Sequence, residues 1–289
     1  MVTVRRSLAG ALVLTAALAA CGAGGKAARQ SAPTRCPSAG RHVVDGGVLR
    51  VPPGARPGAT PLLLVVIPGG GDDPNDHLRL AHRADAAHVA LLYPTRKSGQ
   101  FWQLNDAQGT SDVTNVSNTL DAVLAGGCFD ARRVSITGVS NGSGFATRFA
   151  CARPDRFAAV IPVAAGYRAL DPCPATARAS FLDIHGTADT VVPYLGKAPG
   201  FKGNVPRFTA AWARRDGCST HPHASHPQRL VTRFVYPGCD GGRRVEAIRL
   251  TGTQHGWPGS VGPFTRANPS HFQAAVAVLR FAKAARLAG

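Results

Sequence analysis

A serine at position 140 stands at the centre of Gly138-Val139-Ser140-Asn141-Gly142, a pattern typical of a nucleophile at a sharp strand-to-helix turn. The two glycines leave room for close chain packing at such a turn, which projects the serine hydroxyl above the sheet. The following helix directs its N-terminus at the site, so we expect the backbone N–H of Asn141 to stabilise an oxyanion. The pattern alone also fits a plain Gly/Ser turn, and its place between a buried strand and a helix favours the nucleophile.

A serine hydroxyl needs a base within hydrogen-bond reach and an acid that orients the base. In α/β-hydrolases the order along the chain is serine, acid, histidine. Asp189 follows the apolar run 180–185 in a glycine-containing loop, which makes it the best-placed acid; a loop-capping role is the alternative. Its competitors are Asp171, Asp183, Asp216, Asp240 and Glu246.

His255 follows the apolar run 245–251 in a loop before the last helical segment, which is the usual position of the base. A purely structural histidine is the alternative. Its competitors are His221, His223, His226 and His271. The first three of these lie in a segment rich in Pro and Ser, for which we favour a solvated loop over a metal site. We expect His185 to form local hydrogen bonds that shape the Asp189 loop.

Three glycines follow Pro68, directly after the apolar run 61–67. Backbone N–H groups in this loop are expected to supply the second oxyanion donor, with Gly70 as first choice and Gly71 as second. A plain glycine turn is the alternative.

Apolar runs and helical patterns alternate along the chain, which predicts βαβ units, a mostly parallel twisted sheet and helices on both faces. The sequence therefore predicts an α/β-hydrolase fold, with ligands outside the carboxyl ends of the strands. The expected strands are 61–67, 88–93, 133–138, 158–163, 180–185 and 245–251. The expected helices are 111–126, 141–152, 206–215 and 269–287.

The N-terminus predicts export. Arg5 and Arg6 precede an apolar run that ends in Leu18-Ala19-Ala20-Cys21, which resembles the lipobox of bacterial lipoproteins. We expect residues 1–20 to be a signal peptide, Cys21 to be acylated and residues 21–35 to be a flexible tether. An ordinary signal peptide is the alternative. Residues 36–289 are then one catalytic domain, placed at the cell membrane or outside the cell.

The chain has 289 residues and a formal net charge of +17. Its arginines are scattered, and no basic run or nucleic-acid module is present, so we expect no nucleic-acid partner. Frequent use of Arg as a surface cation explains the charge best, and attraction to anionic surfaces or acidic polymers is the alternative.

Besides Cys21, six cysteines remain, an even number that predicts three disulfides in an exported protein. They are Cys36, Cys128, Cys151, Cys173, Cys218 and Cys239. Spacing does not choose among their 15 pairings. A zinc site is disfavoured, because no C-x-x-C pair occurs.

Three segments together resemble the extracellular polyhydroxybutyrate depolymerase and feruloyl esterase family. They are the turn 132–142 with its continuation to residue 160, the acid loop His185-Gly186-Thr187-Ala188-Asp189 with Val192-Pro193-Tyr194, and the base loop His255-Gly256-Trp257-Pro258-Gly259. The resemblance covers about residues 60–260. One departure is Pro68-Gly69, where the family usually has His-Gly.

The resemblance implies hydrolysis of carboxylic esters through an acyl-enzyme, without metal or cofactor. It suggests feruloyl or acetyl esters on polysaccharide, or polymers and oligomers of 3-hydroxybutyrate, as substrates. It also implies pairing of Cys128 with Cys151 and of Cys218 with Cys239, which leaves Cys36 with Cys173.

Trp102 and Trp257 are candidates to line the substrate pocket, with plain packing as the alternative. We expect a monomer. Two other functions stay open: a ligand-binding lipoprotein of the same fold without chemistry, and a serine peptidase.

Overall fold

The structure is a computed structural model, and it describes residues 36–57, 62–67, 78–97, 99–104, 111–167, 173–196, 203–261 and 266–287. The predicted signal peptide, Cys21, the tether and Gly70 lie outside the described residues. The description below concerns the compact unit that begins at Ala32.

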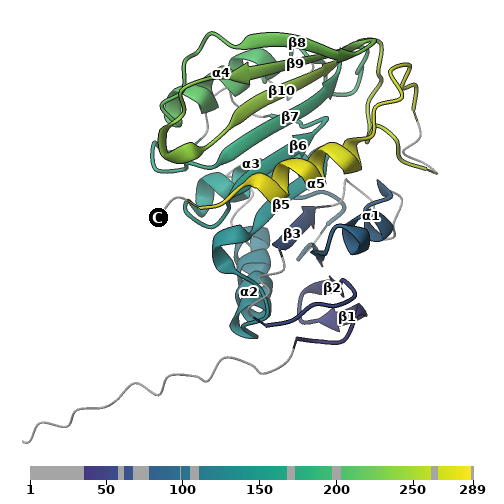
Figure 1. Ribbon diagram of the computed structural model, residues 1–289, viewed down its shortest axis with the longest axis vertical. Helices are drawn as coiled ribbons and strands as arrows, with labels where there is room; N and C mark the ends of the chain where they lie inside the picture. Colours follow the sequence, from purple (N-terminus) through teal and green to yellow (C-terminus); the bar gives the residue numbers. More distant parts are fainter. Residues whose placement is uncertain are drawn as a thin grey trace, which may run out of the picture. The chain divides into compact units, whose positions relative to one another are not determined.

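The centre of this unit is a ten-stranded sheet in the order β1-β2-β4-β3-β5-β6-β7-β10-β9-β8 (Figure 1). The six central strands, from β4 to β10 in this order, run parallel, and antiparallel strands flank them on both sides. The strands are β1 Gly40–Val44, β2 Gly47–Val51, β3 Leu62–Ile67, β4 Val89–Pro94, β5 Ser135–Val139, β6 Ala159–Val163, β7 Ser180–Gly186, β8 His223–Gln228, β9 Val231–Tyr236 and β10 Val245–Leu250.

Helices cover both faces of the sheet, and each face has its own apolar core. Helices α2 (Ser111–Ala125), α3 (Asn141–Ala152) and α4 (Val205–Arg215) pack on one face through side chains such as Val116, Phe149 and Trp212. Helices α1 (Ala81–Ala86) and α5 (Ala274–Ala284) pack on the other, and α5 crosses the sheet in Figure 1. Short 3-10 turns at Ala131–Arg133 and Asp240–Gly242 precede β5 and β10. The predicted mostly parallel sheet with two helical layers is confirmed.

Two sequence expectations are wrong in detail. The segment expected as a solvated loop at 221–226 enters strand β8, an edge strand whose side chains are all exposed, so no apolar alternation announces it. The last helix begins at Ala274 instead of Pro269, because His271 has a positive φ of 53° and the Asn268 and Ser270 side chains bond the backbone of Phe272.

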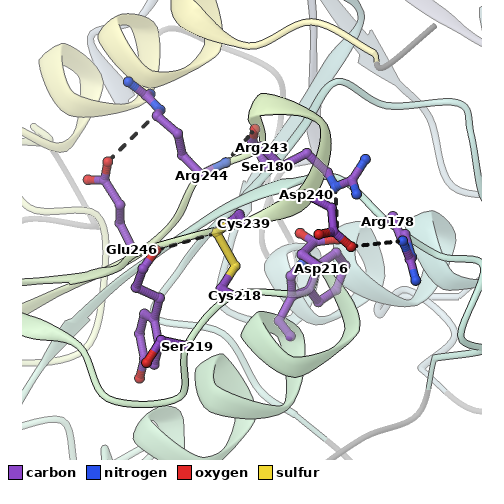
Figure 2. The surroundings of a disulfide bond; sticks show 12 residues. Arg178, Ser180, Asp216, Cys218, Ser219, Cys239, Asp240, Arg243, Arg244 and Glu246 are labelled. Carbon is purple, nitrogen blue, oxygen red and sulfur yellow. Dashed lines mark hydrogen bonds and ion pairs between the residues drawn. A yellow bond between two sulfur atoms is a disulfide. The ribbon is translucent and has the colours of Figure 1, made fainter.

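Three disulfides are present among the described residues, and one has the predicted partners. Cys218 pairs with Cys239 beside the start of β10 (Figure 2). The other predicted pairs, Cys128–Cys151 and Cys36–Cys173, are wrong: Cys36 bonds Cys128, and Cys151 bonds Cys173. The reason is spatial, because Cys36 enters beside the end of α2, with its Cα 5.1 Å from that of Cys128.

No described helix has both the length and the apolar character needed to cross a membrane.

Candidate active site

Ser140 lies at a strained turn between β5 and α3. Its φ of 56° and ψ of −124° are rare for a residue with a side chain, and such outliers cluster at functional sites. Gly138 is required for this turn, since a Cβ there would lie 2.6 Å from the Ile67 carbonyl oxygen and 2.9 Å from the Gly142 carbonyl oxygen. The predicted strand, turn and helix are thus present, and α3 has the predicted bounds, 141–152.

Hydrogen bonds of Ser143 and Asn141 hold the start of α3 in place, and those of Ser143 are buried. The Ser143 hydroxyl lies 2.5 Å from the Gly138 oxygen and accepts a 2.7 Å hydrogen bond from the Val163 N–H. The Asn141 side chain pairs with the backbone of Trp102, accepting its N–H at 2.7 Å and donating to its carbonyl at 3.2 Å. Asn141, the predicted oxyanion donor, is therefore held through its amide group.

Asp189 is positioned by its own loop. One carboxylate oxygen accepts hydrogen bonds from the N–H groups of Val191, at 2.9 Å, and Val192, at 2.7 Å. The loop is joined to the His255 loop, since the Ala188 N–H donates to the Thr253 oxygen at 3.0 Å. A Cβ at Gly186 would lie 2.1 Å from that same oxygen, which explains the glycine. Parallel pairing of β7 with β10 brings the two loops to the same edge.

The three residues singled out from the sequence meet in one hydrogen-bonded row. His255 Nδ1 lies 2.7 Å from the second Asp189 oxygen, and His255 Nε2 lies 2.9 Å from Ser140 Oγ. Because a carboxylate can only accept, Nδ1 carries the proton and Nε2 is free to accept one from Ser140. The Asp189 side chain is fully buried, whereas that of His255 is 18% exposed. This arrangement can take a proton from a serine hydroxyl and return it to a leaving group.

A second row of buried polar groups, formed by His185, Asp183 and Tyr167, lies behind Asp189. The sequence predicted only His185 of these three. His185 Nε2 donates to the Val192 oxygen at 2.8 Å and lies 3.3 Å from Asp189 Oδ2. On its other side, His185 Nδ1 lies 3.8 Å from Asp183, which accepts a short hydrogen bond from the Tyr167 hydroxyl. His185 therefore shapes the acid loop as predicted, while Asp183 and Tyr167 were missed as its neighbours.

The pKa values of Asp189, His185 and Asp183 are all shifted from their ordinary values. Burial alone would raise the pKa of Asp189, but hydrogen bonds from His185 and His255 lower it well below its ordinary value. Burial opposes a charged His185, yet its bond to Asp189 and the charge of Asp183 raise its pKa. Asp183 has a raised pKa because of burial, offset in part by His185 and Tyr167. The lowered pKa favours ionised Asp189, and an ionised carboxylate accepts the hydrogen bond from His255 Nδ1.

Trp102 and Trp257 are both packed into the core, and each is 1% exposed. The Trp102 ring stacks on Phe145 with the ring centroids 4.7 Å apart, and Trp257 belongs to the cluster around α5. A ring enclosed in this way offers no free face to a substrate. The structure assigns both to packing, with Trp102 bound to Asn141 through its backbone.

The histidines of the segment expected as a loop lie on β8 or just before it. Within the described ranges, no group of three or more His, Cys, Asp or Glu side chains is placed to hold a metal ion. His223 and His226 are exposed on β8, and His226 lies 3.4 Å from the Thr232 hydroxyl.

Comparison with known families supports the sequence resemblance. Residues 46–169 match the esterase PHB depolymerase family. The predicted family resemblance is confirmed. The matched segment runs from β2 past β6 and contains the Ser140 turn, whereas Asp189 and His255 lie beyond it.

Curated relatives of this kind are esterases and a depolymerase. The chain is 27% identical over 197 residues to a bifunctional acetylxylan esterase/xylanase of Neocallimastix patriciarum, covering 67% of this chain and 28% of that protein. It is 27% identical over 185 residues to feruloyl esterase B of Piromyces equi, covering 59% and 34%. It is 25% identical over 211 residues to poly(3-hydroxyalkanoate) depolymerase C of Paucimonas lemoignei, covering 62% and 50%. The matches thus span half or less of each relative.

The solved structure of an acetyl xylan esterase from Aspergillus awamori has a similar fold, with a TM-score of 0.54 at 19% identity. The match covers 72% of this chain and 88% of that one. The chain has the α/β-hydrolase fold predicted from its sequence.

Proposed function

We propose that this chain is an exported serine carboxylesterase with Ser140 as nucleophile, His255 as base and Asp189 as orienting acid. The observation that carries the proposal is the row Ser140–His255–Asp189, joined by contacts of 2.9 and 2.7 Å at a strained turn. The esterase activity of the relatives supports it.

The reaction follows from the protons that these groups hold. His255 takes the Ser140 proton while Oγ attacks the ester carbonyl, and the N–H groups of Asn141 and Gly70 stabilise the oxyanion. His255 then gives its proton to the departing alcohol, which leaves an acyl group on Ser140. Water, deprotonated by His255, releases the acid and restores the serine. No metal or organic cofactor takes part in these steps.

Export and a lipid anchor at Cys21 are part of the proposal. Residues 1–20 are the signal peptide, residues 21–35 the tether and residues 36–289 a monomeric catalytic domain. The three disulfides support export, because such bonds persist in oxidising compartments. Incorporation of a labelled fatty acid into the wild-type chain but not into a Cys21→Ser variant tests the anchor.

The substrate class is a carboxylic ester of a polysaccharide or of a 3-hydroxyacid oligomer, as the names of the relatives indicate. Initial rates on acetylated xylan, methyl ferulate and 3-hydroxybutyrate oligomers distinguish these possibilities. A peptide substrate added to the same panel tests the peptidase alternative, which predicts cleavage of the amide instead.

Replacing the nucleophile gives the direct test of activity. Ser140→Ala should lower kcat on p-nitrophenyl butyrate by about 10⁵–10⁶-fold, since the serine acts as part of a unit. Ser117→Ala is a matched control, because Ser117 lies on α2 and its hydroxyl donates to the Val113 oxygen of the same helix. A folded Ser140→Ala protein with unchanged hydrolysis would contradict the assignment.

A further inference from the structure

The amino ends of the parallel strands meet at the edge of the sheet opposite Ser140, and cations gather there. Helices α3, α4 and α5 run back along the strands and end at the same edge. We call this surface the basic edge. Its cations are Arg132, Arg133, Arg153, Arg156, Arg178, Arg214, Arg215, Arg243, Arg244, Lys283 and Arg286.

Carboxylates at the same strand and helix ends are fewer and leave several cations uncompensated. They are Asp121, Asp130, Asp155, Asp216, Asp240 and Glu246. Ion pairs join Arg243 to buried Asp216 at 3.3 Å and Arg178 to Asp240 at 3.5 Å (Figure 2). By contrast Arg153, Arg214 and Arg286 are exposed and form no ion pair with any described residue. The basic edge therefore carries net positive charge that the fold does not use.

Part of the basic edge is hollowed. A cavity of about 270 Å³ opens between Arg178, Arg243 and Arg286, with Asp155 and the apolar Phe157 and Leu287 also in its wall. At about 30 Å³ per water molecule this volume admits a small polar group such as a phosphodiester. Arg guanidinium groups bind phosphate oxygens in a two-pronged geometry, which gives the cavity a chemical preference.

The chain also enters the domain at this edge. Strand β1 is antiparallel to β2, which is antiparallel to β4, so β1 starts at the same edge as the parallel strands. Cys36, just before β1, is bonded to Cys128, which lies between α2 and β5. Any anchor on the N-terminal side of Cys36 therefore reaches the domain at the basic edge.

We propose that the basic edge binds the headgroups of anionic phospholipids and so turns the Ser140 edge away from the bilayer. This inference rests on the proposed export and anchoring at Cys21. An acidic polysaccharide is the less suitable partner, because a polymer held at this edge would lie on the wrong side of the sheet for Ser140. In this proposal the lipid anchor keeps the domain near the bilayer, and the basic edge determines which side of the domain faces the bilayer.

Vesicle binding by the chain starting at Ala32 tests this surface without the anchor. That chain keeps both core clusters, which lie entirely within the described residues from Cys36 onward. We expect it to bind vesicles made of equal parts phosphatidylglycerol and phosphatidylcholine, and not vesicles of phosphatidylcholine alone. Each cation near an anionic surface raises binding by about fivefold. Binding should weaken steeply as salt rises above physiological strength.

Two triple variants with the same net charge locate the surface. Replacing Arg153, Arg214 and Arg286 by Gln should lower the vesicle partition coefficient on the order of 100-fold. Replacing Arg79, Arg207 and Arg229 by Gln is the matched control, because these exposed arginines lie at the opposite edge, and it should change the coefficient by less than about threefold. Equal losses in the two variants would overturn the proposal, since binding would then follow total charge.

Two further measurements separate the alternatives. Polygalacturonate should not compete with the vesicles at equal charge concentration, and strong competition would replace the lipid by an acidic polymer. Hydrolysis of p-nitrophenyl butyrate should be the same in both triple variants. Ser140→Ala should bind vesicles like the wild type. Vesicle binding and ester hydrolysis are therefore independent measurements, and either proposal can fail while the other stands.

Discussion

Two buried aspartates, one at each edge of the sheet, have pKa values that are shifted in opposite directions. Asp189 at the Ser140 edge is flanked by His185 and accepts hydrogen bonds from His255 and from two backbone N–H groups, and these contacts lower its pKa. Asp216, at the end of α4, is fully buried beside Arg243 (Figure 2). Neither of its oxygens accepts a hydrogen bond, and burial, opposed by Arg243 and Arg215, raises its pKa to about 7.

The difference shows that a nearby cation alone does not hold a buried carboxylate in its charged form. Desolvation acts on both groups, and hydrogen bonds directed at the charged oxygens decide the outcome. Asp189 has those donors because its loop turns back on itself and meets the His255 loop. Asp216 ends α4 through backbone hydrogen bonds, so its charged form is favoured mainly by Arg243 and Arg215.

Of the changes proposed for the two aspartates and their neighbours, neutralising Asp189 should have the largest effect on kcat. Asp189→Asn keeps the shape but presents an amide to His255, which favours the wrong tautomer. We expect kcat on p-nitrophenyl butyrate to fall by about 10³–10⁴-fold with KM little changed. Asp240→Asn, an exposed carboxylate in another loop, is the control. A loss of less than tenfold in a folded Asp189→Asn protein is incompatible with the orienting role.

Removing the group that flanks Asp189 should have a smaller effect. His185→Leu leaves the Val192 carbonyl unpaired and Asp189 without its second neighbour, so the loop shifts and kcat should drop by about 100-fold. His185→Gln can still donate to that carbonyl and should restore part of kcat. The control variant His223→Gln, at an exposed position on β8, should leave kcat unchanged. If Leu and Gln at position 185 give equal rates, the hydrogen bond to Val192 does not position the acid.

Asp216, the second aspartate of the comparison, should make the free energy of unfolding depend on pH. Its folded pKa of about 7 lies above the ordinary unfolded value, so between about pH 4 and pH 7 the native state holds a proton that the unfolded chain has released. The free energy of unfolding therefore falls as pH rises through this window. Asp216→Asn is neutral throughout and should lack this part of the slope, a difference on the order of 1–3 kcal/mol between pH 5 and pH 8.

Denaturant unfolding at several pH values measures this slope, with Asp240→Asn as a matched control from the same corner of the molecule (Figure 2). The control should keep the wild-type slope, because Asp240 is largely exposed. Parallel curves for wild type and Asp216→Asn would show that Asp216 is ionised in the folded protein at pH 5.

The parts of the site that the sequence predicts are those set by local pattern. Gly138, Ser140 and the bounds of α3 follow from a buried run, a turn and helical spacing, and the strand ends locate Asp189 and His255. Groups that meet across the sheet do not follow from such patterns. Tyr167 reaches Asp183 only because β6 and β7 are neighbours, and Cys36 meets Cys128 only because β1 folds back beside β2. Edge strand β8 has no buried face and leaves no apolar signal.

The central claim is that Ser140 is activated by His255, and labelling by a fluorophosphonate probe followed by peptide mass spectrometry tests it most directly. The phosphonyl group should be found on the peptide that contains Ser140, and labelling should fall by more than about 100-fold in His255→Ala, which removes the base. A probe bound to another serine, or labelling of Ser140 that does not depend on His255, would contradict the account.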